Sequence, residues 1–129
     1  MHMTTTTETA TETMTKTTTL NERQKEFADA LYEAYRTKKP LKMSDWDGVV
    51  TDDDTAYAVQ DRFVANKKLP TGGYKVSLTS KQTQDMFDSD SPLYGQQVDS
   101  HFLPSTALLS LKEQTMDPLL EVELGFRAT

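Results

Sequence analysis

The amino-acid sequence predicts an α+β fold in which two N-terminal helices pack on a mixed or antiparallel β-sheet. Before residue 70, apolar residues recur at helical spacing in two segments, which is typical of amphipathic helices. After residue 73, apolar and polar residues alternate, which indicates strands. The length of 129 residues suits a single domain with a hydrophobic core.

The chain opens with a threonine-rich leader. Residues 1 to 19 consist largely of threonine with a few charges and offer nothing to bury, so burial cannot offset the entropy lost on ordering them. We therefore predict a disordered leader over residues 1 to 19 and a folded domain over residues 20 to 129.

The first organised element is a helix over about residues 21 to 38. Asn21 is a candidate N-cap, and Gln24, three residues later, can complete a capping box. Pro40 stops the helix because it lacks a backbone donor and restricts the residue before it. The apolar stripe of this helix comprises Phe27, Leu31, Ala34 and Tyr35.

A second helix is predicted to begin after Thr51, whose hydroxyl is a candidate cap. The three aspartates at positions 52 to 54 place negative charge where a helix N-terminus favours it. The turn that starts at Asn66 ends the helix. Its predicted buried face comprises Ala56, Tyr57, Val59, Phe63 and Val64.

The rest of the chain is predicted to be largely strand and loop. Residues 74 to 79 alternate apolar and polar and predict a strand with one face in solvent. A short helix is expected over residues 80 to 87 and a short strand or turn over residues 93 to 98. One or two apolar segments follow within residues 101 to 111, and residues 119 to 128 again show the strand pattern.

Charge and hydropathy bear on partners and compartment. The net charge of -6 repels phosphate backbones and anionic lipid surfaces, which argues against nucleic acid and membranes as partners. The sequence has neither a bilayer-spanning apolar run nor a signal peptide, so we expect a cytoplasmic protein. A small anionic substrate would need a local cation.

The residue types restrict which metals the chain can hold. The sequence contains no cysteine, which excludes disulfides and thiolate ligands. Any metal would be held by oxygen atoms or by His2 and His101, and oxygen ligands favour magnesium, manganese or calcium.

The most suggestive pair for chemistry is Glu121 and Glu123. Strand alternation places both carboxylates on one face, while Val122 and Leu124 face the other way. Two like charges so close repel, and a hard cation between them would make the arrangement favourable. Taken alone, the Glu-x-Glu pattern is more often a solvated strand face.

Four further features have two interpretations each. Lys75 lies on the polar face of its strand, where a lysine is usually just exposed. The Gly72-Gly73 pair permits a close backbone approach or a plain flexible turn. His101 is a possible ligand but more often a surface histidine. Trp46 could close over a ligand, although a single tryptophan usually anchors packing.

Four blocks, read in order, resemble one known family. They are DTAYAVQ at residues 54 to 60, GYKVSLTSK at 73 to 81, SPLYG at 91 to 95 and EVELGF at 121 to 126. Together they make the chain look like the 2-keto-4-pentenoate hydratase and 4-oxalocrotonate decarboxylase family, within the fumarylacetoacetate hydrolase-like superfamily. The resemblance covers nearly everything after residue 20.

The resemblance implies a metal-dependent lyase acting by hydration or decarboxylation. It implies that Glu121 and Glu123 bind Mg²⁺ or Mn²⁺, which chelates a small anionic 2-oxo or 2-hydroxydienoate acid. It also implies that Lys75 is the catalytic lysine, which binds the substrate carboxylate or steers proton transfer.

The chain departs from the family pattern in several places. The resemblance spans about the first half of a family member, so a third metal carboxylate and much of the β-core are missing. An incomplete fumarylacetoacetate hydrolase-like fold is therefore expected. Leu93 stands where hydratases often carry an acidic residue, which tilts away from hydration. Ser77 replaces a usual glycine, and Val122 a common proline.

A rival hypothesis from another class is a non-catalytic binding or assembly module. Strand edges left uncovered by the missing half would favour association. Under this hypothesis the chain oligomerises with itself or with a longer homologue. We expect a homo-oligomer.

Overall fold

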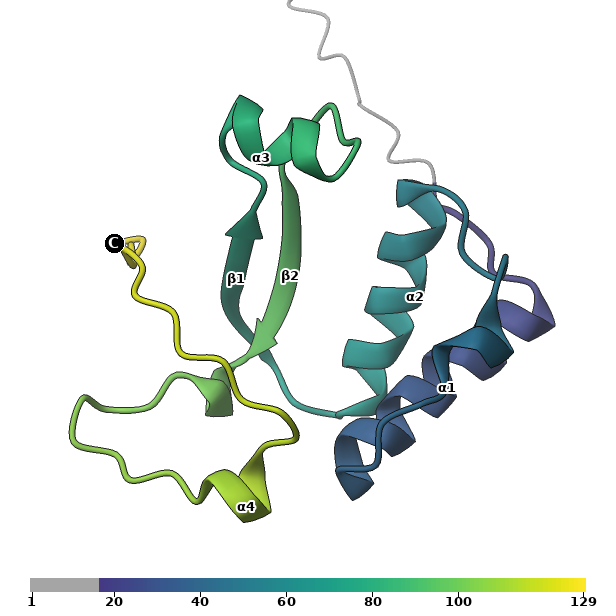
Figure 1. Cartoon of the computed structure of the whole chain (residues 1–129). Helices are drawn as coiled ribbons and strands as arrows, with labels where there is room; N and C mark the ends of the chain where they lie inside the picture. The colour runs from purple at the N-terminus through teal and green to yellow at the C-terminus, as the bar shows by residue number, and fades with distance from the viewer. Residues whose placement is uncertain (1–16) are drawn as a thin grey trace, which may run out of the picture.

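The computed structural model describes residues 17–129 and shows a small α+β protein (Figure 1). Most of the predicted leader lies outside these residues. The elements in chain order are α1 (Glu22–Thr37), the 3-10 turn η1 (Met43–Trp46), α2 (Asp53–Asn66), β1 (Thr71–Ser77), α3 (Lys81–Met86), β2 (Leu93–Val98), the 3-10 turn η2 (Asp99–His101) and α4 (Leu111–Gln114). The predicted α+β class is confirmed at this level.

Helix α1 has the ends that its sequence predicts. The Asn21 side chain accepts a hydrogen bond from the backbone N–H of Gln24, and the Gln24 side chain accepts one from the backbone N–H of Asn21, both at 2.9 Å. This is the expected capping box. Lys38 ends the helix in the left-handed conformation, with φ 58°.

Helix α2 is capped one residue later than expected. The cap is Asp52 rather than Thr51, because the Asp52 carboxylate accepts hydrogen bonds from both the backbone N–H and the hydroxyl of Thr55. A carboxylate also suits the positive end of the helix dipole better than a hydroxyl does. Val59 and Val64 are buried as predicted, whereas Ala56 is exposed.

The small core lies between α1 and α2. Phe27, Ala28 and Val59 form its buried centre. The Trp46 ring lies 5.1 Å from the Phe27 ring, and the Arg23 guanidinium stacks over Trp46 at 4.1 Å. These contacts give Trp46 a packing role rather than a position over a ligand.

A polar clamp also joins the two helices. Arg62 donates two hydrogen bonds to the Asp29 carboxylate, at 2.9 and 2.7 Å, and the Asn66 amide donates a third at 2.7 Å. The hydrogen bonds from Arg62 and then Asn66 hold the pKa of Asp29 below its ordinary value of 3.8. They favour the charged carboxylate in the folded state.

Because of these hydrogen bonds to Asp29, we expect the protein to lose stability in acid. A lowered folded-state pKa contributes stability above pH 3.8, and that contribution disappears as pH falls through the folded-state value. Asp29→Asn should therefore destabilise the protein at pH 7 and make little difference near pH 2. Urea unfolding between pH 2 and pH 7 measures the free energy of unfolding of each variant. Asp47→Asn, a change at an exposed residue, is the control. A constant difference between Asp29→Asn and the parent would contradict the prediction.

The sheet is antiparallel and has two strands, β1 and β2. Lys75 pairs with Gly95 and Val76 with Tyr94, and an irregularity falls between Thr71 and Gly73. Of the two N-terminal helices, α2 packs against β2, and α1 lies on the other side of α2 (Figure 1). The Tyr57 ring of α2 stacks on the Tyr94 ring at 4.5 Å.

Strand β1 differs from its prediction in extent and burial. It begins at Thr71 and ends at Ser77, because Leu78 has φ 55° and cannot continue the strand. Its expected buried face is open, and the side chain of Tyr74 is 60% exposed. The reason is that α2 covers β2 and leaves β1 at the uncovered edge of the sheet.

The strand predicted over residues 119 to 128 does not form. Residues 115 to 129 have no regular secondary structure, and Val122 and Phe126 are 97% and 93% exposed. A strand exists only when a neighbouring backbone pairs its N–H and C=O groups. The alternating pattern is present, but the described residues 17–129 supply no backbone ladder for it.

Candidate site at Lys75, Glu121 and Glu123

The structure brings together the three residues that the sequence singles out. Lys75 extends from β1, and the C-terminal segment passes beside that strand (Figure 1). The Lys75 Nζ atom lies 2.5 Å from Glu123 Oε1 and 3.0 Å from Glu121 Oε2. One ammonium group is thus held by both carboxylates, although the residues lie more than 45 positions apart in the chain.

The electrostatics of this trio favour a protonated lysine. Hydrogen bonds to Glu123 and then Glu121 raise the pKa of Lys75, because both stabilise the charged ammonium. The three side chains are 41 to 52% exposed, so water screens the ion pairs. One positive and two negative groups leave a local charge of -1, which can attract a further cation.

A cleft of about 920 Å³ opens beside the trio. Its polar lining includes Lys75, Glu123 and His101, and its apolar lining includes Tyr74 and Phe102. Phe102 is a wall residue that the sequence analysis missed, because no local pattern shows where an irregular segment will fold back. The cleft combines a cation, a carboxylate and apolar walls, which suits a small organic anion.

The glycine pair of β1 explains how Phe102 reaches the cleft. A Cβ on Gly73 would lie 2.7 Å from Phe102 Cζ, and one on Gly72 would lie 2.5 Å from Asp99 Cα. Both distances are too short for a side chain. The close-approach interpretation of Gly72-Gly73 therefore holds, and this packing sets η2 and Phe102 against β1.

His101 is not joined to the carboxylate pair. Its Nδ1 lies 3.2 Å from Gln97 Oε1, and its Nε2 lies 3.0 Å from the Tyr35 hydroxyl. In the tautomer that carries its proton on Nδ1, that nitrogen donates to Gln97 and Nε2 accepts from Tyr35. Burial, together with the charges of Lys67 and Lys38, lowers the pKa of His101.

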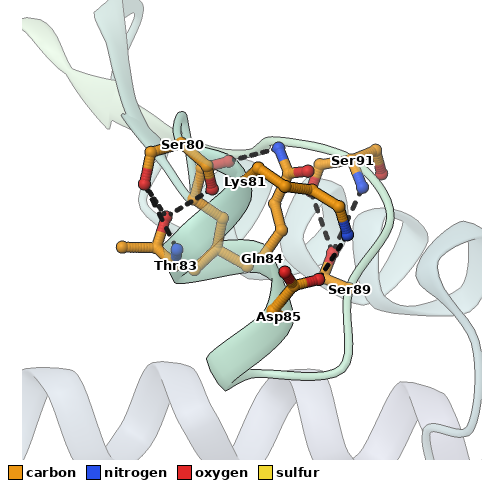
Figure 2. Close-up of polar contacts among 8 residues, drawn as sticks. Ser80, Lys81, Thr83, Gln84, Asp85, Ser89 and Ser91 are labelled. Carbon is orange, nitrogen blue, oxygen red and sulfur yellow. Dashed lines mark hydrogen bonds and ion pairs between the residues drawn. The ribbon is translucent and has the colours of Figure 1, made fainter.

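A second hollow, of about 890 Å³, lies around α3. Ser77 lines this hollow rather than the cleft, so it does not narrow the space beside Lys75. Figure 2 shows that the polar groups here bond to one another. Gln84 Nε2 donates to the Leu78 carbonyl at 2.8 Å, and Ser89 Oγ donates to the Ser91 carbonyl at 2.9 Å.

Glu121 and Glu123 are the two carboxylates that the structure places together at Lys75. Among residues 17–129, no group of three or more His, Asp or Glu side chains is placed to hold a metal ion. Mg²⁺ in proteins is often bound by one or two carboxylates together with water and substrate oxygens. The ammonium of Lys75 contacts both carboxylates, so the two glutamates are the described residues that could hold such an ion.

Comparisons with family models, with curated proteins and with solved structures found no match. Within the described part of the chain, none of the helices combines the length and apolar character needed to span a bilayer.

Proposed function

We propose that this chain is a hydratase- or decarboxylase-like protein with a fumarylacetoacetate hydrolase-like fold. Its substrate would be a 2-oxo or 2-hydroxydienoate acid, and its cofactor Mg²⁺ or Mn²⁺. The observation that carries the proposal is the contact of Lys75 Nζ with Glu121 and Glu123, at 3.0 and 2.5 Å. The resemblance had selected these same three residues from separate blocks of the sequence.

The raised pKa of Lys75 favours one of the two roles that the resemblance implies for this lysine. A lysine kept protonated is a poor general base and a good partner for a carboxylate. We therefore assign Lys75 to binding the substrate carboxylate. Tyr74 and Phe102 would lie beside that ion pair as apolar walls of the cleft.

Glu121 and Glu123 would hold the divalent ion together with substrate oxygens. When bound, that ion supplies Lewis-acid polarisation of the 2-oxo group. The two glutamates and Lys75 fix the position and orientation of the acid, and such placement is a large part of catalysis.

The enzyme proposal has a direct test. Loss of ultraviolet absorbance of 2-hydroxypenta-2,4-dienoate and of 2-oxo-hexenedioate is followed with millimolar Mg²⁺ or Mn²⁺. Turnover is expected to need metal and to disappear in Lys75→Met but not in Lys112→Met, a charge-matched change on α4. Absence of turnover with both substrates and both metals would refute catalysis by this chain.

One observation favours a second candidate, the assembly module. The C-terminal segment exposes five large apolar side chains, each at 83 to 97%, which are unfavourable in water. They are Leu119, Leu120, Val122, Leu124 and Phe126. Pairing of this segment with a second copy or a longer homologue would cover them.

Size-exclusion chromatography with light scattering tests the module. We expect an oligomer that dissociates when Leu124→Ser and Phe126→Ser are combined, with no dissociation in the control Met86→Ser, an exposed apolar residue on α3. A monomer at all concentrations would exclude self-assembly. An oligomer without metal-dependent turnover would favour the module over the enzyme.

A further inference from the structure

Four lysines gather at the C-terminal ends of α1 and α2. They are Lys38, Lys39, Lys67 and Lys68, and the two helix ends lie near one another (Figure 1). A helix C-terminus carries about half a negative charge, so two ends offset roughly one of the four positive charges. Compensation of the helix dipoles therefore leaves most of this charge unexplained, in a protein whose net charge is -6.

Two of these lysines contact the ring of Tyr35. The Nζ atoms of Lys38 and Lys67 each lie 4.3 Å from the centre of the Tyr35 ring. Lys67 also lies 4.4 Å from the centre of the Phe63 ring. The Tyr35 hydroxyl meets His101 Nε2 at 3.0 Å. We call Tyr35, Lys38, Lys67 and His101 the lysine–tyrosine cluster.

Two acidic side chains of α1 are engaged in other ion pairs. Glu33 pairs with Arg36 at 2.7 Å, and Asp29 pairs with Arg62 at 2.7 Å. Within residues 17–129, no salt bridge involves Lys38, Lys67 or His101. The cluster thus holds two cations that lack a counter-charge from the described residues.

Partial burial makes this arrangement unfavourable without an anion. Burial and the charge of Lys38 lower the pKa of Lys67, and burial together with both lysines lowers the pKa of His101. Each effect disfavours positive charge at this place. A bound anion would reverse both effects.

We propose that the lysine–tyrosine cluster binds a phosphate group. Two ammonium groups match the two negative charges of a phosphate dianion, whereas a carboxylate carries only one. Lysines bind phosphates as mobile point charges and need no fixed planar geometry. This site is separate from the carboxylate pair, and only His101 borders both the cluster and the cleft.

Nuclear magnetic resonance with inorganic phosphate tests the proposal. At pH 7.5 and constant ionic strength, phosphate should cause saturable shifts at Tyr35, Lys67 and His101, and should raise the pKa of the His101 imidazole. Lys67→Gln and Lys38→Asn should each weaken binding at least about tenfold. Asparagine suits the left-handed backbone at position 38.

Three controls make the result decisive. Lys112→Gln and Lys75→Met should leave phosphate binding unchanged, and acetate, with a single negative charge, should bind more weakly than phosphate. Linear shifts without saturation, equal shifts with chloride, or unchanged affinity in Lys67→Gln would each refute the site. Loss of phosphate binding in Lys75→Met would instead place the anion in the cleft and overturn the assignment to the cluster.

Discussion

Replacing Lys75 with methionine is expected to tighten Mn²⁺ binding several-fold while abolishing turnover. The Lys75 ammonium lies 2.5 Å from Glu123 Oε1 and 3.0 Å from Glu121 Oε2, so it competes with a divalent ion for the same oxygens. Removing it changes the local charge from -1 to -2 and frees both carboxylates. Under the proposed function, turnover should be lost because the carboxylate of the substrate would no longer have a positively charged partner at position 75.

The glutamates should respond in the opposite direction. Glu121→Gln or Glu123→Gln is expected to weaken Mn²⁺ binding about a hundredfold, because each removes a charged oxygen ligand from a two-carboxylate site. Calorimetric titration with Mn²⁺ measures these affinities in the parent and all variants. Glu113→Gln on α4 is the matched control and should bind as the parent does.

Tighter Mn²⁺ binding in Lys75→Met, together with weaker binding in Glu121→Gln and Glu123→Gln, would distinguish a metal site from an ordinary ion-pair network. If Glu121 and Glu123 only neutralise Lys75, the parent and Lys75→Met will both lack measurable Mn²⁺ affinity. If Lys75→Met weakens Mn²⁺ binding, the lysine supports the metal site and competition is wrong.

The second large effect is expected from Gly72→Ala, which should destabilise the protein by about 1 to 3 kcal/mol, the usual range for overpacking. The new Cβ would lie 2.5 Å from Asp99 Cα and 2.9 Å from Asp99 N, and neither backbone atom can move freely. Asp99 N–H also donates to the Pro70 carbonyl at 2.9 Å. Moving Asp99 aside would break that hydrogen bond and detach η2 from β1.

Gly95→Ala provides a matched control in the partner strand. Its Cβ would meet only side-chain atoms, with Gln60 Oε1 at 3.7 Å and Gln97 Nε2 at 3.8 Å, which is ordinary contact distance. This variant should be unchanged or more stable by up to about 1 kcal/mol, because alanine restricts the unfolded chain. Urea unfolding compares both variants, and equal stabilities would show that η2 packs loosely on β1.

Local sequence signals predicted the local structure well. Asn21 and Gln24 form the expected capping box, and β2 spans the residues 93 to 98 that the pattern indicated. The cap of α2 was misplaced by one residue, since Thr51 and Asp52 both satisfy the pattern and the hydrogen bonds to Thr55 decide between them. Such signals are reliable because a cap is made by residues three positions apart.

Structural features that depend on residues far apart in the chain were predicted less well. Residues 119 to 128 alternate as a strand does, yet they stay unpaired because alternation fixes side-chain direction and not the presence of a neighbouring backbone. The apolar face of β1 is likewise open, because α2 covers β2 instead. The wall formed by Phe102 depends on the space left by Gly72 and Gly73, which are more than 25 positions earlier.

The sequence by itself determined α1 with its capping box, located α2 and α3 to within a residue or two, and singled out Lys75, Glu121 and Glu123 as candidates for chemistry. The tertiary structure alone decided that these three meet at one ammonium group, because a salt bridge across more than 45 residues depends on how the chain returns to β1. It also decided that Lys38 and Lys67 share Tyr35. Helix ends converge through packing, and a one-dimensional pattern does not encode which ends will meet.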